Sequence, residues 1–175
     1  MKQNKNINLN RFLEAQKDMY DIALKEVKSG RKISHWIWFI YPQIYGFGIS
    51  ETSQKYGIKN LKEASAYLKH PILGFRLREI TGELIELEEN DPEIIFGEVD
   101  SRKVHSSLTL FSLIERGEQN VFKDGLKKFF NGRRNYQTLV LIILPFTLRR
   151  WILKLYNRYS SNFFWYQIKK YFNVH

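Results

Sequence analysis

Apolar residues recur at helical spacing nearly throughout the chain, and this periodicity constrains the fold more than any other feature. The clearest run extends from Leu73 to Leu87, where successive apolar residues stand four, three, four and three positions apart. Such spacing places them on one face of an amphipathic helix. No segment alternates apolar and polar residues convincingly, as a half-buried strand does. The sequence therefore predicts an all-α, multihelical single domain.

Residues that favour helix ends divide this pattern into separate helices. A first helix is expected to start after Asn10 and to end at Gly30 without interruption. Pro71 is expected at the first position of the long helix that contains Leu73 to Leu87. Gly97 and Gly132 are expected to end two later helices. Five polar residues stand where a side chain caps a first turn: Ser34, Ser50, Asn60, Asp91 and Asp100.

Charge is distributed unevenly between the body of the chain and its C-terminal part. The chain has 28 basic and 18 acidic residues, a formal net charge of +10. Residues 133–175 hold eight of the basic residues and no acidic one, which leaves 20 basic against 18 acidic residues before them. The excess charge belongs to the C-terminal part, so the body does not have the composition of a nucleic-acid-binding domain. We do not expect nucleic acid as its partner.

Composition also indicates a compartment. The chain contains no cysteine, which excludes disulfides and thiolate chemistry and fits a reducing cytoplasm. The N-terminal stretch MKQNKNINLN is basic but lacks the apolar run of a secretory signal. No stretch of eighteen apolar residues is present, so a membrane-spanning helix is not expected. The expected location is cytoplasmic.

After Gly132 the composition changes, and we divide the chain into a domain over 1–143 and an extension over 144–175. Residues 133–175 hold eleven of the 27 aromatic residues and no Ala, Gly, Asp or Glu. From Leu148 onward, apolar and basic residues fall on opposite faces of a predicted amphipathic helix. Several interpretations of residues 148–172 stay open. The apolar face completes the core, lies on a membrane surface, or contacts a protein partner or another copy of the chain. Alternatively, this stretch is an out-of-frame reading of AT-rich DNA.

The stretch SHWIWFIYPQIYGFGIS, residues 34–50, combines many aromatic rings with a few varied polar groups. A short helix that is apolar all round is a buried one. Trp36 and Trp38 stand about 200° apart on a helix, so they contact different neighbours. Buried indoles need hydrogen-bond acceptors, and buried His35 and Gln43 need partners as well. These requirements predict a polar cluster inside an aromatic wall.

We expect the partners to come from the helix after Asp100, whose polar residues recur at helical spacing. Such a cluster fixes the geometry of the core or lines a ligand pocket, and rings beside a cation and hydroxyls suit a planar anion such as a nucleotide. His35 is the candidate general base or a hydrogen-bonded core residue. Neither a metal nor a cofactor is expected, because HxxxH and HxxE spacings are missing at His35. The candidate ligand-binding residues are Ser34, His35, Trp36, Trp38, Gln43, Ser50, Arg76, Asp100, Lys103, Ser106 and Ser107.

Three segments together resemble one known family. They are SHWIWFIYPQIYGFGIS, AYLKHPILGFRLRE and IFGEVDSRKVHSSLTLF, preceded by LNRFLEAQKDMYDIALKEVKSGRK. With these segments in order, the chain from Leu9 to Leu141 is similar to the family called domain of unknown function 1810. The resemblance implies an all-α domain and brings no activity, cofactor or catalytic residue. Members end soon after the residues matching Thr138 and Leu139, so the extension departs from the pattern.

Three classes of function stay open on these grounds, of which the third is nucleic-acid binding through the basic extension, with an affinity that falls steeply as salt rises. In the first, the chain binds a small anionic molecule beside the tryptophan segment, with or without catalysis. In the second, it is a non-enzymatic interaction module, in which the aromatic cluster is core and the extension docks on a protein partner or a membrane. The pair Gly46 and Gly48 is not a dinucleotide fingerprint, because the third glycine and a preceding strand are missing.

Overall fold

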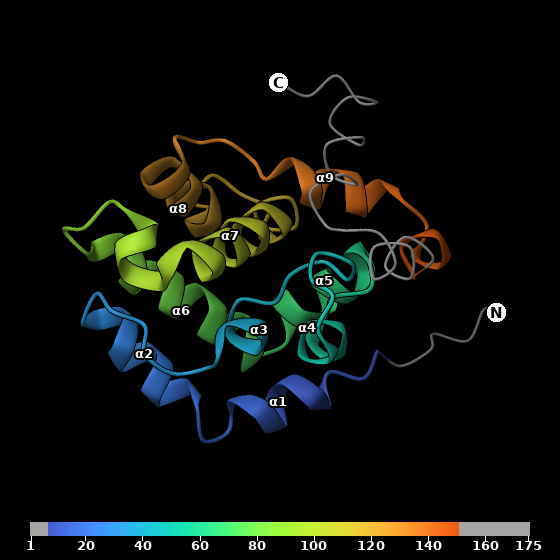
Figure 1. Ribbon diagram of the computed structural model, residues 1–175, viewed down its shortest axis with the longest axis horizontal. Helices are drawn as coiled ribbons and strands as arrows, with labels where there is room; N and C mark the ends of the chain where they lie inside the picture. Colours follow the sequence, from blue (N-terminus) through green and yellow to red (C-terminus); the bar gives the residue numbers. More distant parts are fainter. Residues whose placement is uncertain (1–6, 151–175) are drawn as a thin grey trace.

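Helices make up most of residues 7–150, the part of the chain that the computed structural model describes (Figure 1). Within this part there is no strand, only one isolated bridge between Ile44 and Ile58. The predicted all-α, multihelical single domain is confirmed. The labelled helices are α1 Asn10–Gln16, α2 Tyr20–Lys28, α3 Ile37–Ile40, α4 Glu51–Tyr56, α5 Leu61–Lys69, α6 Leu73–Glu86, α7 Pro92–Ser112, α8 Val121–Phe130 and α9 Tyr136–Ile143, and residues 146–150 are helical as well.

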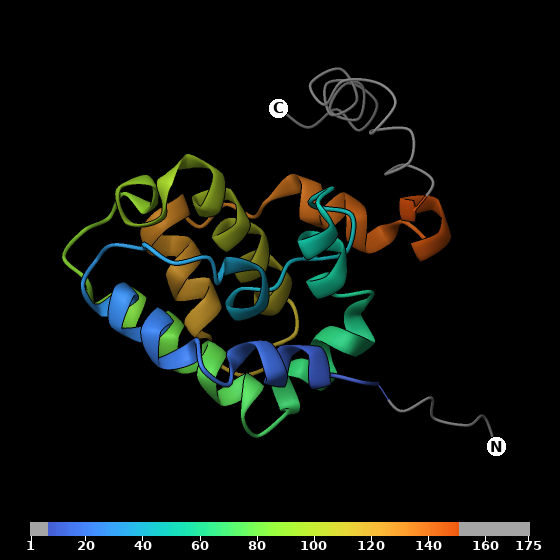
Figure 2. The same cartoon turned by 60° about the horizontal axis from the view of Figure 1, so that its bottom comes forward.

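Two long helices organise the domain. α6 packs against α2, α5 and α8, while α7 packs against α3, α5, α8 and α9 (Figures 1 and 2). The predicted apolar stripe of α6 lies in the core, since Leu73, Leu77, Ile80 and Leu84 are each at most 1 % exposed. Burying one such side chain contributes about 1.5–3 kcal/mol, so this stripe anchors the fold.

Side-chain caps begin several of the helices. The predicted caps Ser50, Asn60 and Asp91 each accept a backbone N–H from the following turn, which starts α4, α5 and α7. Asn120 and Asn135 cap α8 and α9 in the same way. These last two caps, and α9 itself, were not predicted; residues 139–143 of α9 are all apolar and show no helical period.

The single helix expected from Asn10 to Gly30 is wrong. The chain forms α1 and α2 instead, separated by residues 17–19. Tertiary hydrogen bonds on either side of the break explain the difference. Gln16 donates to the carbonyl of Phe39 at 2.7 Å, and the Tyr20 hydroxyl donates to Glu79 at 2.6 Å. α1 packs on α3 while α2 packs on α6, so the break lets each half of the predicted helix follow its own packing partner.

Three predicted helix starts are also corrected. Ser34 does not cap α3, because its hydroxyl donates to the carboxylate of Glu26 and α3 begins only at Ile37. Pro71 lies in the turn before α6 rather than in its first position. Asp100 is not a cap either, because it lies in the first turn of the helical segment that follows Gly97.

Gly97 ends the first helical segment of α7, as predicted. Its φ of 74° lies in the left-handed region, which glycine adopts without steric cost. The interruption gives α7 a second helical segment from Glu98 to Ser112. Asp100 and Lys103 both belong to this segment.

The first residues of the predicted extension pack on the loop that follows α3. The buried guanidinium of Arg149 donates to the carbonyls of Leu144 and Tyr45, at 3.0 Å and 3.3 Å. The rings of Phe146 and Tyr45 lie 4.7 Å apart between centroids. The predicted amphipathic helix and partner surface, residues 148–172, lie outside the described residues from 151 onward. The division at residue 143 stays a prediction.

Among the helices within residues 7–150, none combines the length and the apolar composition that crossing a membrane requires.

Candidate functional site

A buried carboxylate on α2 holds the start of the tryptophan segment in place. Glu26 is 8 % exposed, and it accepts hydrogen bonds from the backbone N–H groups of Ile33 and Ser34 at 2.8 and 3.0 Å. It also accepts from the hydroxyl of Ser34 at 2.5 Å and the indole of Trp36 at 2.7 Å. Burial alone raises the pKa of this carboxyl, but the hydrogen bonds together outweigh burial and lower the pKa. Glu26 therefore carries its negative charge at neutral pH.

One carboxylate on α7 is shared by two lysines. Asp100 bonds Lys103 at 2.6 Å through one oxygen and Lys32 at 2.7 Å through the other. The side chains of Lys103, Lys32 and Asp100 are only 17 %, 7 % and 16 % exposed, respectively. Burial raises the pKa of Asp100, yet its bonds to Lys103 and Lys32 outweigh burial and lower it. Two ammonium groups against one carboxylate leave one positive charge in excess.

Each of these lysines also lies over an indole ring. The ammonium of Lys103 lies 4.5 Å from the ring centroid of half-buried Trp38, and that of Lys32 lies 5.3 Å from buried Trp36. The two tryptophans contact different neighbours, as their spacing predicted. We call Lys32, Trp36, Trp38, Asp100 and Lys103 the lysine–tryptophan cluster.

His35 is not the buried core residue that the aromatic neighbourhood predicted. Its side chain is exposed, and within residues 7–150 it makes no hydrogen bond, ion pair or ring contact. The physical reason lies in the two neighbours of His35, because Glu26 of α2 binds both Ser34 and Trp36 and so turns the intervening imidazole outward. His35 is a free imidazole on the surface beside the lysine–tryptophan cluster.

The two serines that follow Lys103 on α7 are both buried, but they differ in bonding. The hydroxyls of Ser106 and Thr138 lie 2.7 Å apart, which ties α7 to α9. The hydroxyl of Ser107 is 0 % exposed and has no hydrogen-bond partner within the described part of the chain. Ser107 stands one turn after Lys103, but it is closed off from any substrate in solution. It does not serve as a nucleophile in this conformation.

The remaining candidates take part in other contacts. The amide of buried Gln43 donates to the carbonyl of Tyr41, and exposed Ser50 caps α4. Arg76 lies over the ring of Tyr20, 4.5 Å from its centroid, and donates to Gln16 at 3.4 Å. The interactions of these three candidates therefore involve no residue of the lysine–tryptophan cluster.

Sequence reasoning missed two residues that build the site, Glu26 and Lys32. Glu26 carried a signal, because it stands three residues after Ala23 and next to Val27, on the buried face of α2. A carboxylate on a buried face needs donors, and Ser34 and Trp36 supply them. Lys32 lies in a loop, where no periodicity indicates direction.

The cluster can hold an anion by charge and a planar group by stacking. Lysine has three N–H donors, and Lys103 uses one on Asp100. Within residues 7–150, no three His, Asp or Glu side chains are placed to hold a metal ion together. His35 is the only imidazole of the predicted set.

Comparison with known proteins gives a family and a fold. The family model described as "Protein of unknown function (DUF1810)" matches residues 6–142. Among solved structures, a conserved hypothetical protein from Mycobacterium tuberculosis matches with 39 % sequence identity and a TM-score of 0.76. That match covers 79 % of this chain and 98 % of the other. No curated protein matches the chain.

Proposed function

The chain belongs to the DUF1810 family of proteins of unknown function, and from that premise we propose that it binds a small anionic molecule at the lysine–tryptophan cluster. The ligand carries a planar group as well as a phosphate or carboxylate, as a nucleotide does. The observation that carries this proposal is that Lys32 and Lys103 share the single carboxylate of Asp100.

The charge balance supports an anion. Because the two lysines and Asp100 are mostly shielded from water, their excess positive charge is less screened than charge on an open surface. A phosphate near Lys103 supplies the missing negative charge without displacing Asp100, since Lys103 has further donors. Exposed His35 has a ring N–H that offers a further donor.

The half-buried ring of Trp38 supports a planar group. The ammonium of Lys103 lies over the Trp38 ring, while another part of Trp38 is open to solvent. A planar ligand that covers this exposed part excludes water from the indole and stays near the ammonium. Trp36 has no such role, because it is fully buried and bonded to Glu26.

The proposal is tested with the full-length chain by thermal unfolding in the presence of AMP, ATP and inorganic phosphate. A ligand that binds only the folded state raises the melting temperature, with about 2.7 kcal/mol gained at a hundredfold excess over Kd. We expect a rise with at least one nucleotide and its loss in the variant Lys103→Met. A flat response to all three probes contradicts the proposal.

Arg102 provides the matched control. It precedes Lys103 on α7 and has the same charge, but it is exposed and pairs with Glu98. Arg102→Met therefore removes one positive charge without touching the cluster. Equal weakening by both variants indicates general attraction to a basic protein, and it overturns the proposal.

A second candidate function is a protein-interaction module, favoured by exposed apolar side chains around the cluster. Ile33 is 73 % exposed next to Lys32, Val99 is 61 % exposed next to Asp100, and Ile94 is 64 % exposed. The backbone of Lys32 bonds the carbonyl of Ile95 at 2.8 Å, which brings these segments together. A protein partner that is retained by the Ile22→Asp variant and lost with Ile33→Asp supports this alternative, because Ile22 is also exposed but lies on α2.

A further inference from the structure

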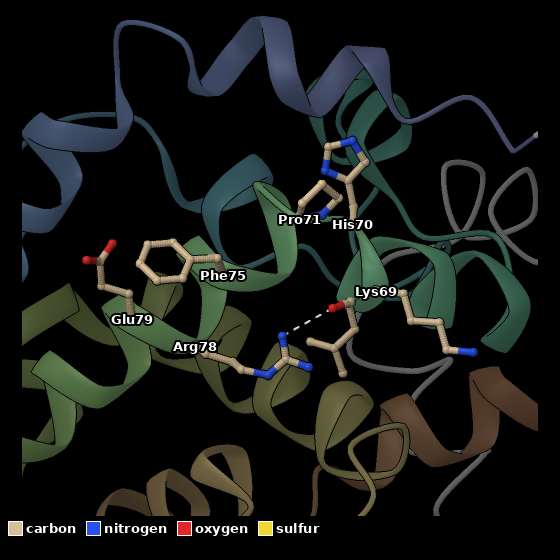
Figure 3. A pocket seen from close by; sticks show the side chains of 7 residues that line it. Lys69, His70, Pro71, Phe75, Arg78 and Glu79 are labelled. Atoms are coloured by element: carbon tan, nitrogen blue, oxygen red, sulfur yellow. Dashed lines mark hydrogen bonds between the residues drawn. The ribbon is translucent and has the colours of Figure 1, made fainter.

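Two adjoining pockets lie at the corner between α5 and α6, where the second family segment AYLKHPILGFRLRE lies, and Figure 3 shows the smaller of them. One has a volume of about 430 Å³ and the other about 600 Å³. They share Leu68, Lys69 and Arg78 and contain no residue of the lysine–tryptophan cluster. We call the two together the corner groove. Its volume is in the range of small-molecule sites.

Arg78 fixes the shape of this corner. Its guanidinium donates to the carbonyls of Leu68 and Gly74 at 3.1 and 3.0 Å, and to the carboxylate of Glu115 at 2.7 and 3.0 Å. The bond to Leu68 is drawn in Figure 3. These contacts join the end of α5 to α6 and to the turn after α7. Most donors of Arg78 are thus already used, so we assign it a structural role.

The smaller pocket is mainly apolar. Leu68, Pro71 and Phe75 line it, and Phe75 is 60 % exposed although it stands on a helix of the core. An exposed aromatic ring at the edge of a pocket is apolar surface that a ligand can remove from water. Figure 3 shows Phe75 on α6 between Glu79 and Pro71.

The larger pocket carries uncompensated positive charge. Lys69 and Arg116 both line it, both are exposed, and neither makes an ion pair within residues 7–150. The carboxylate of Glu115 is occupied by Arg78. Glu79, on the side of the smaller pocket, accepts the hydroxyl of Tyr20 at 2.6 Å. Glu79 does not line the larger pocket, where Lys69 and Arg116 therefore leave an excess of positive charge.

We propose that the corner groove binds a small amphiphilic anion. Its apolar body, an aryl or acyl group, lies in the smaller pocket against Phe75, and its carboxylate, phosphate or sulfonate contacts Lys69, which lines both pockets. Arg116 adds positive charge on the far side of the anion. This site is separate from the lysine–tryptophan cluster and stands or falls independently of it.

Fluorescence titration of the full-length chain with two related probes tests the proposal. The first probe is 1-anilinonaphthalene-8-sulfonate, an aromatic anion, and the second is N-phenyl-1-naphthylamine, its uncharged relative. Lys69→Glu is expected to raise the Kd of the anion by about fivefold or more, and to leave the neutral probe nearly unchanged. Phe75→Gln is expected to raise the Kd of both probes, because it removes the apolar contact.

Two control variants separate the groove from the rest of the surface. Lys62→Glu makes the same charge change on α5, and Ile94→Gln removes an apolar side chain that is 64 % exposed on α7; neither residue lines the groove. Both controls should bind as the unaltered protein does. The proposal is overturned if the controls weaken binding as much as the groove variants, if Lys69→Glu affects both probes equally, or if neither groove variant changes either Kd. Thermal unfolding of each variant verifies that it is folded, and Lys69→Gln replaces Lys69→Glu should the latter not fold.

Discussion

Glu26 accepts the indole N–H of Trp36 at 2.7 Å, and this bond joins α2 to the segment that carries both tryptophans. The same carboxylate binds Ser34 and the backbone of Ile33. A single acidic residue therefore determines where the segment starts and which way His35 points. The candidate site therefore depends on a residue that lies outside the lysine–tryptophan cluster.

The substitution Glu26→Gln should destabilise the fold by about 2–4 kcal/mol, because a buried acceptor of several hydrogen bonds becomes an amide whose N–H₂ faces donors. Urea unfolding measures the loss as a lower midpoint at unchanged slope. Glu14→Gln on α1 is the control, since Glu14 is exposed. A loss below about 0.5 kcal/mol, the range of ordinary surface substitutions, contradicts this role.

Stability should fall in acid because of the same carboxylate. Burial disfavours the charged form of Glu26, but its hydrogen bonds favour that form more strongly. The pKa of Glu26 therefore lies below the ordinary 4.5. The unfolded chain then binds more protons than the folded one, so the contribution is complete above pH 4.5 and is lost as pH falls through the lowered pKa. Asp100 acts in the same direction below its ordinary 3.8. Urea midpoints between pH 7 and 3 should decline less steeply in Glu26→Gln than in Glu14→Gln, and parallel declines contradict the assignment.

Much of the fold could be predicted from spacing, because helix faces and caps are local properties. The stripe from Leu73 to Leu84 and the caps Ser50 and Asn60 depend only on residues within a turn or two. The break between α1 and α2 could not be predicted, since α1 packs on α3 and α2 packs on α6, and both partners lie further along the chain. Local sequence patterns do not indicate which distant residues a side chain contacts.

The candidate site was predictable in outline only. The tryptophan segment and the helix of Lys103 meet, as expected, where the ammonium lies over Trp38. Their junction nevertheless depends on Lys32, a loop residue whose direction follows from its backbone bond to Ile95. The outward turn of His35 likewise results from tertiary hydrogen bonds on its two neighbours. Side-chain direction in loops is set by such contacts rather than by sequence period.

The pairing of Lys32 with Asp100 should be energetically coupled, unlike a surface pair on the same helix. Both side chains are largely shielded, at 7 % and 16 % exposed, whereas Arg102 and Glu98 are 62 % and 71 % exposed. A double-mutant cycle with Lys32→Met and Asp100→Asn should give a coupling energy of about 1–2 kcal/mol. The matching cycle on Arg102 and Glu98 should give about 0.3–0.5 kcal/mol, the usual range for exposed pairs. Equal couplings in the two cycles contradict the view that the cluster is electrostatically distinct.

Two glycines of α6 should respond in opposite directions to replacement by alanine. A Cβ at Gly74 would lie 2.0 Å from the carbonyl oxygen of Leu68 and 3.0 Å from the Arg78 guanidinium, whereas a Cβ at Gly82 meets nothing within 4 Å. Gly74→Ala must therefore push α5 from α6 and disturb the bonds of Arg78, which should cost about 1–3 kcal/mol or more. Gly82→Ala should gain about 0.5–1 kcal/mol, because alanine restricts the unfolded chain and favours the helix. Urea unfolding of both variants measures the difference, and a neutral Gly74→Ala would mean that the α5–α6 contact, and with it the corner groove, is not built as described.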